Sequence, residues 1–267
     1  MSVALQCKKL HFSFSKAPQL SDINLSFKEG EFVGLIGANG AGKSTLLQLL
    51  LGLLKAQSGD VLLHGTNINR IKRREIAKQL AFVPQSIELP FAFSVQQLVA
   101  MGRNPYLGAF ELETQADKEL IQQAMQQTDI THLQDRYVNS LSGGEKQRVI
   151  IARALAQQSP TILLDEPIAS LDICHQLTTL QLIQSLTQSG KTAITALHDL
   201  NLAAQYCDRL MLIGKREDGS TTIISDGSPE QVITAENLKK HFSITADIII
   251  RNGHLQIENI APIKSSY

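Results

Sequence analysis

Cysteine is scarce in this sequence, and its three cysteines lie far apart. Cys7, Cys174 and Cys207 form no C-x-x-C pair and are odd in number, so neither a zinc site nor a disulfide framework is indicated. Reduced thiols in the cytosol are the simple interpretation. Net charge is absent as well, because 25 basic and 25 acidic residues cancel. This balance argues weakly against duplex nucleic acid or an anionic lipid surface as a partner, and we expect no nucleic acid partner.

Long apolar runs are also missing. No stretch approaches ~18 uninterrupted apolar residues, so we expect no membrane-spanning helix, and any membrane segment would belong to another subunit. The start, Met1–Lys9, lacks a basic stretch followed by a long apolar run, so we expect no signal peptide. No internal repeat is found, so we expect the chain to hold one functional unit and not two. At 267 residues and 43% apolar content, the chain is globular and long enough for a core plus a lobe.

The sequence contains a glycine-rich stretch between an apolar run, Phe32–Ile36, and the helix-forming Thr45–Leu50. Strand, glycine loop and helix form the context of a phosphate-binding loop, in which backbone N–H groups and the helix start face anionic oxygens. Lys43 would reach the β- and γ-phosphates, and the Ser44 hydroxyl would hold Mg²⁺. The predicted nucleotide-binding residues are Gly37, Ala38, Asn39, Gly40, Ala41, Gly42, Lys43, Ser44 and Thr45. This motif alone leaves kinases, GTPases and many ATPases open.

Hydrophobic periodicity predicts an α/β protein with a helical lobe. We expect strands at 3–14, 22–27, 32–36, 60–63, 80–83, 161–164 and 192–197. Helices are expected at 71–79, 176–188, 200–206, 229–232 and 236–242, and residues 94–157 follow a helical pattern without a convincing strand. Two hairpins are expected, at 210–225 through Glu217-Asp218-Gly219 and at 248–257 through Asn252-Gly253.

Two further stretches carry chemistry. The first, Leu141–Arg148, puts Ser142, Gly143, Gly144 and Glu145 at the start of a nearly all-apolar helix, which is a second anion-binding surface. One site on one chain does not need two such surfaces, whereas two chains arranged head to tail do.

The second stretch is the apolar run 161–164, which ends in two carboxylates. A buried strand points such groups at a ligand over the edge of the sheet. Asp165 would hold Mg²⁺, and Glu166 would polarise the attacking water as general base.

Together these motifs resemble the ATP-binding cassette (ABC) proteins over about residues 10–250. Ser170 and Asp172 are similar to the loop that crosses the dimer interface of that family. The resemblance implies that Gln85 senses Mg²⁺ and water, that His198 contacts the γ-phosphate, and that Phe14 stacks on adenine, with Phe12 as the competing candidate. Ile168 departs from the threonine of many members, with no expected loss of chemistry. The implied fold is one α/β phosphate-loop (RecA-like) domain, residues 1–267. Its core, 1–85 and 158–267, includes an antiparallel β subdomain, and its inserted helical subdomain is 86–157.

The stretches 103–108, 137–144, 171–176 and 197–208 are similar to ATPases of ferric-siderophore, haem and cobalamin importers, with the siderophore branch closest. The resemblance implies a bacterial importer subunit that binds ATP and Mg²⁺ as a homodimer with two membrane permease subunits, at the cytoplasmic face of the inner membrane. A substrate-binding protein outside that membrane would deliver the cargo. Residues 87–95 and 101–108 would form the permease docking groove. Import of molybdate, export, a soluble cassette and a phosphotransferase are the alternatives.

Overall fold

The computed structural model describes residues 2–14, 19–87, 91–108, 110–216, 219–251 and 253–263. The chain divides into two compact units, the first formed by residues 1–70 and 193–267 and the second by residues 71–192. The predicted turn residues Glu217, Asp218 and Asn252, and residues 88–90 of the predicted docking stretch, lie outside the described residues.

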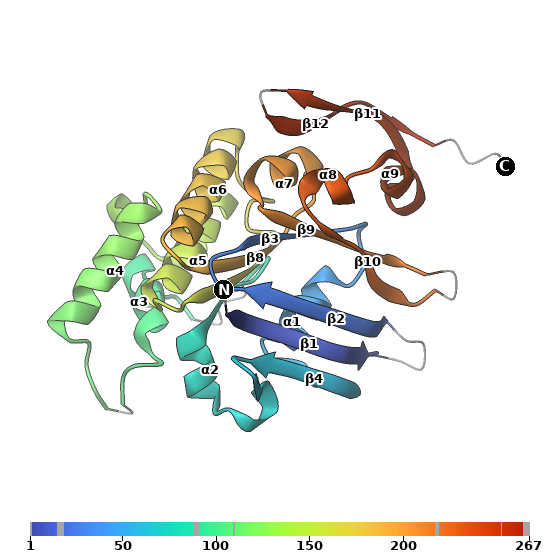
Figure 1. Ribbon diagram of the computed structural model, residues 1–267. Helices are drawn as coiled ribbons and strands as arrows, with labels where there is room; N and C mark the ends of the chain where they lie inside the picture. The colour runs from blue at the N-terminus through green and yellow to red at the C-terminus, as the bar shows by residue number, and fades with distance from the viewer. Residues whose placement is uncertain are drawn as a thin grey trace. The chain divides into compact units, whose positions relative to one another are not determined.

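A mixed sheet forms most of the first unit, with strands in the order β5-β4-β1-β2-β10-β9-β3-β8. Neighbours β1, β2 and β4 pair antiparallel (Figure 1), whereas β3 pairs in parallel with β8 and β9. All residues of β3 and β8 are buried, as expected for strands covered on both faces. The strands are β1 (Val3–Phe12), β2 (Leu20–Lys28), β3 (Phe32–Ile36), β4 (Ser58–Leu63), β5 (Thr66–Asn67), β8 (Thr192–Ala196), β9 (Arg209–Lys215) and β10 (Thr221–Gly227).

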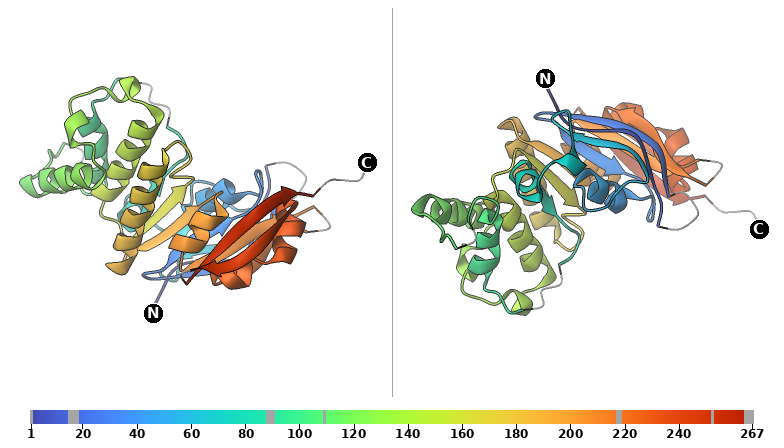
Figure 2. Two further views of the ribbon diagram at one scale, coloured as in Figure 1. Left: turned by 90° about the horizontal axis from the view of Figure 1, so that it is seen from above. Right: turned by 90° about the horizontal axis from the view of Figure 1, so that it is seen from below.

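The helices of the first unit are α1 (Lys43–Leu50), α7 (Leu200–Tyr206), α8 (Pro229–Val232) and α9 (Ala235–Phe242). Four leucines of α1 are fully or almost fully buried, so α1 is the buried helix that its apolar sequence predicts. A separate hairpin, β11 (Ile244–Arg251) with β12 (His254–Pro262), lies beside α7 (Figures 1 and 2). The side chain of Asn201 in α7 pairs with both backbone groups of Ile257 in β12, which fixes the hairpin there.

The second unit combines two parallel strands with a group of helices. Strands β6 (Leu80–Val83) and β7 (Thr161–Asp165) pair in register from Leu80↔Thr161 to Val83↔Leu164. The helices are α2 (Arg73–Gln79), α3 (Val95–Ala100), α4 (Gln115–Gln127), α5 (Gly143–Ala156) and α6 (Ile173–Gln188). Helices α3, α4 and α5 pack together, drawn in teal to yellow-green in Figure 2. The described residues of 86–157 contain no strand, only an isolated bridge between Ser94 and Tyr137.

A buried ion pair holds this helical group together. Arg103 Nε lies 2.8 Å from Asp117 Oδ1, and the side chains of both residues are less than a tenth exposed. Arg103 also donates from Nη1 to the Ala156 carbonyl at the end of α5, and its guanidinium lies 4.1 Å from the centre of the Tyr106 ring. One cation thus ties the helical turn that follows α3 to the start of α4 and the end of α5.

The α/β class predicted from the sequence is confirmed, and the elements agree closely with expectation. Four predicted elements have the expected bounds, namely the strands 32–36 and 80–83 and the helices 200–206 and 229–232. Within the described ranges, none of the helices combines the length and the apolar character needed to traverse a bilayer.

Candidate functional site

The phosphate loop lies in the first unit, between buried β3 and buried α1. Gly37, Gly40 and Gly42 have φ values of +152°, +74° and +90°, a region that side chains other than glycine rarely adopt. A Cβ at Gly37 would also collide with the carbonyl oxygen of Ile213. The loop therefore needs glycine at position 37 for both conformation and space.

The lysine of this loop is buried within it. Lys43 is 5% exposed, and its Nζ donates to the carbonyl of Gly37 at 2.8 Å and to that of Ala38 at 3.3 Å. Residues 38–40 form the exposed rim of the loop, and Ser44 is half-buried. Helix α1 has no side-chain cap and no acidic residue in its first turn. The N–H groups of its first turn and its dipole therefore favour an anion at the loop.

His198 and Gly37 lie at equivalent positions after neighbouring parallel strands, because each comes two residues after a paired residue of β8 or β3. The parallel register pairs Leu35 with Ala196, and Leu197 N donates to the Leu35 carbonyl at 3.1 Å. Parallel strands carry ligand-binding groups at their carboxyl ends. The first unit thus brings the exposed His198 and the phosphate loop to the same edge of the sheet.

The two candidate aromatic residues differ in exposure. Phe12 is buried at the end of β1, whereas Phe14 is 69% exposed. The two rings meet edge to face, with their centroids 4.7 Å apart. Because Phe12 is a core residue, Phe14 alone offers a ring face to a ligand, and adenine stacking by Phe14 stays a prediction.

The predicted carboxylates follow β7 in the second unit. Asp165 is the last residue of this fully buried strand, and Glu166 is half-buried with φ +50°. A positive φ is uncommon for a residue with a side chain and often marks a functional site. Gln85 Nε2 donates to Glu166 Oε2 at 2.7 Å. The register explains this contact, because Gln85 and Glu166 each come two residues after the paired Val83 and Leu164.

The serine–glycine stretch begins α5. Ser142 is the N-cap, and its Oγ accepts from Glu145 N at 3.3 Å. In return, the Ser142 backbone N–H and hydroxyl donate to Glu145 Oε2 at 2.7 and 2.8 Å, which completes a capping box. Hydrogen bonds from Ser142 lower the pKa of Glu145 below its usual value. Ser142 and Gly143 are exposed, so this helix start is accessible to an anion on another molecule.

Ser170 and Asp172 lie beside this helix start. A Cβ on Gly144 would lie 3.5 Å from the Ser170 carbonyl oxygen, so the two loops run close together. Asp172 caps α6, because its Oδ1 accepts from the backbone N–H of His175 at 2.9 Å. This hydrogen bond, followed by that of the His175 ring, lowers the pKa of Asp172.

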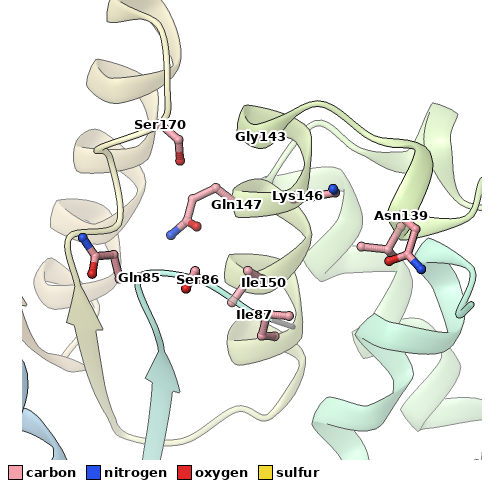
Figure 3. Close-up of a pocket in the computed structure, with 10 residues that line it drawn as sticks. Gln85, Ser86, Ile87, Asn139, Gly143, Lys146, Gln147, Ile150 and Ser170 are labelled. Carbon is pink, nitrogen blue, oxygen red and sulfur yellow. The ribbon is translucent and has the colours of Figure 1, made fainter. Parts of the chain in front are cut away.

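A cavity of about 180 Å³ lies among these elements of the second unit. It is lined by Gln85, Ser86, Ile87, Val138, Asn139, Gly143, Lys146, Gln147, Ile150 and Ser170. Figure 3 shows Gln147 extending from α5 toward the space between Gln85, Ser86 and Ser170. Sequence reasoning missed Gln147. The sequence offered one sign of it, because Gln147 is a polar residue among the otherwise mostly apolar buried residues of α5.

Each unit therefore assembles part of the predicted set. The first unit holds the phosphate loop, Phe14 and His198, and the second holds Gln85, Asp165, Glu166 and the serine–glycine helix start.

Relatives of this chain include several import ATP-binding proteins. The hemin import ATP-binding protein of Pseudomonas fluorescens is 42% identical over 90% of this chain and 92% of its own length. The petrobactin import ATP-binding protein of Bacillus anthracis is 39% identical over 91% of this chain and 88% of its own length. A cobalamin import ATP-binding protein of Halobacterium salinarum is 41% identical over 84% of this chain. This chain spans about half, 54%, of the length of that cobalamin relative.

Solved structures agree with the sequence relatives. A metal-chelate type ABC transporter in an inward-facing conformation superposes with a TM-score of 0.81 at 28% identity, covering 99% of both chains. A dimeric bacterial ABC transporter cassette gives a TM-score of 0.73 at 28% identity, covering 84% of this chain and 98% of that one.

The sequence profile of the ABC transporter family matches residues 20–169, more than half of the chain. The resemblance drawn from the motifs is thereby confirmed, and this protein belongs to the ABC transporter family.

Proposed function

We propose that this chain hydrolyses ATP as the nucleotide-binding subunit of a bacterial importer for an iron chelate of the ferric-siderophore kind. The observation that carries the hydrolytic part is the contact of Gln85 with Glu166 at 2.7 Å, at the end of the strand that also carries Asp165. A carboxylate that an amide side chain holds in this position is better suited to activate a water molecule than merely to bind the nucleotide.

Lys43 and the loop backbone bind the triphosphate in this proposal. The Lys43 ammonium already lies among the loop carbonyls, and the glycine conformations leave the loop N–H groups free of side-chain crowding. His198, at the same edge of the sheet, would donate to the γ-phosphate.

The residues available for Mg²⁺ fit that ion. Ser44, Gln85 and Asp165 supply a hydroxyl, an amide oxygen and a carboxylate, and such hard oxygen donors are the ligands that Mg²⁺ accepts alongside phosphate and water. Asp165 is 4% exposed, and a nearby cation would offset the cost of a buried charge. When bound, the ion supplies charge neutralisation on the phosphates.

Glu166 acts as the general base. It takes a proton from the water that attacks the γ-phosphorus, and the water oxygen forms the new bond as the bond to the leaving β-phosphate oxygen breaks. Its φ of +50° ends the extended backbone of the strand at this residue. Gln85 donates a hydrogen bond to Glu166, so a movement of Gln85 on binding of Mg²⁺ and nucleotide would change the position of the general base.

A second copy of the chain completes the site. The exposed start of α5 offers Ser142, Gly143 and Gly144, with Glu145 fixing the serine. In a head-to-tail pair of copies, this surface would cap the nucleotide held by the other copy, with Ser170 and Asp172 at the interface. ATP then does work because it binds the closed pair better than the open pair.

The permease subunits would dock on the helical group. In this proposal the chain is one ABC ATPase domain, with residues 1–85 and 158–267 as its core and residues 86–157 as its helical subdomain.

An exposed aromatic residue of the helical subdomain suits permease docking. Phe91 is 69% exposed, and its ring lies edge to face on Phe93 with the ring centroids 6.3 Å apart, so it offers an aromatic contact to a permease. The chain would work at the cytoplasmic face of the inner membrane, with a substrate-binding protein outside it.

The test is uptake in a host that depends on this system. Cells with the wild-type chain should accumulate radioactive iron supplied as a ferric siderophore, and cells with Lys43→Ala should not. Hemin and cobalamin serve as competing cargoes, because related proteins carry those names. Uptake that persists in the Lys43→Ala strain would contradict the proposal. Loss of hemin or cobalamin uptake alone would move the cargo to that class.

A further inference from the structure

A buried amide group in the second unit has no hydrogen-bond partner. Gln147 is 3% exposed, and its Nε2 is buried without an acceptor in the described part of the chain. It extends into the cavity of about 180 Å³ defined above (Figure 3). A buried donor without a partner destabilises a fold, whereas an apolar side chain of the same shape would not. The sequence thus keeps an amide where leucine would be more stable.

Gln85 shares this cavity and is bound elsewhere. Its Nε2 donates to Glu166 Oε2 at 2.7 Å, and that contact occupies an oxygen of the proposed general base. A hydrogen bond donated to a carboxylate stabilises its charge and makes it a weaker proton acceptor. Release of Glu166 by Gln85 would therefore make Glu166 a better base for the attacking water, and a second partner would hold the released amide in one position.

We propose that Gln147 is a positioning residue for hydrolysis, whose Nε2 holds the Gln85 side-chain oxygen once Gln85 has released Glu166. Both side chains line one cavity, and Gln85 is exposed, so its three side-chain torsions can carry the amide between the two partners. An amide oxygen has two lone pairs, so this hydrogen bond still leaves one for the proposed Mg²⁺ contact. The inference rests on the proposed function.

This arrangement links two motifs of the second unit. Gln147 comes one helical turn after Gly143 and Gly144 on α5. A nucleotide at the start of α5 would therefore lie one helical turn from the residue that we propose to hold Gln85.

The experiment compares Gln147→Leu with Gln85→Ala and the double variant, in the full chain with ATP hydrolysis as readout. Gln147→Leu should leave the thermal midpoint equal or higher, because an unsatisfied donor is removed. It should lower kcat by about two- to tenfold, the worth of one hydrogen bond, with KM for ATP unchanged. In the Gln85→Ala background, Gln147→Leu should have no further effect on kcat.

Gln157, at the other end of the same helix, provides the matched control. Its Nε2 donates to the Leu80 carbonyl at 2.9 Å and to Ser159 Oγ at 3.1 Å. Gln157→Leu should therefore lower the thermal midpoint, and any effect on kcat should multiply with that of Gln85→Ala.

If the decreases in kcat caused by Gln147→Leu and Gln85→Ala multiply in the double variant, the inference is overturned. Gln147 would then bind water or Ser170 instead. An unchanged kcat in Gln147→Leu would overturn it as well. A wild-type chain without ATP hydrolysis would bring down the proposed function, and this inference with it.

Discussion

Replacing Arg103 by methionine tests the buried ion pair with Asp117 most clearly. Methionine keeps the apolar stem but removes a guanidinium that lies 2.8 Å from Asp117 Oδ1 and donates to the Ala156 carbonyl at 2.9 Å. Breaking a buried pair by removing one partner costs about 3–5 kcal/mol. Asp117 Oδ2 keeps two donors from Thr114, so we expect the lower end, about 3 kcal/mol.

The assay is urea unfolding, with thermal unfolding beside it. A loss of about 3 kcal/mol lowers the midpoint temperature by about 6–12 °C for a domain of this size. Arg103→Met combined with Asp117→Asn should lose less than the sum of the two single variants, because the stranded carboxylate is also gone. A loss below about 1 kcal/mol in Arg103→Met, as for an exposed pair, would refute this reasoning.

The same pair predicts a direction for acid sensitivity. Hydrogen bonds from Thr114 and then Arg103 lower the pKa of Asp117 from 3.8 to about 2. Because the folded pKa lies below the unfolded one, the stabilisation is complete above the unfolded pKa and is lost as the pH falls toward about 2. The difference in unfolding free energy between the wild type and Asp117→Asn should thus stay constant near neutrality and shrink between pH 3.8 and about 2. If the difference in unfolding free energy stays constant through this pH range, the lowered pKa of Asp117 is contradicted.

The remaining predictions concern the nucleotide site. Lys43→Ala should weaken ATP binding by roughly 10- to 100-fold, the worth of a hydrogen bond to a charged group, as measured by titration calorimetry; unchanged affinity would remove Lys43 from the site. Glu166→Gln should still bind ATP and accumulate as a dimer in sedimentation experiments, while hydrolysis falls by orders of magnitude. Near-normal turnover in Glu166→Gln would show that another group activates the water. Ser142→Arg should keep ATP binding by the isolated chain but abolish turnover, and normal turnover would count against capping by a second copy.

Local sequence patterns were sufficient for most elements. The apolar runs 32–36 and 161–164 lie in fully buried strands, because a strand covered on both faces is built mostly from apolar residues. The helix expected at 176–188 begins earlier, at Ile173. Asp172 caps it there, but the exposed Ile173 and Cys174 interrupt the apolar periodicity that marks a helix start in a sequence.

Contacts between residues that are far apart in the sequence could not be predicted from such local patterns. The sequence assigned Arg103 to an exposed docking stretch, whereas the structure buries it against Asp117, fourteen residues further along the chain. Gln147 lies on a predicted helix, yet its missing partner is visible only when the cavity beside Gln85 is formed. The Gln85–Glu166 contact likewise depends on the register of β6 and β7, which no single-sequence pattern specifies.

A mixing experiment tests the shared site most directly. Lys43→Ala and Ser142→Arg chains, each inactive alone, are combined and assayed for ATP hydrolysis. In a mixed pair, the intact loop of one copy faces the intact α5 start of the other, so the account predicts that activity reappears on mixing. If the mixture remains as inactive as its two components while both variants still fold, each chain carries a complete centre of its own and the account is contradicted.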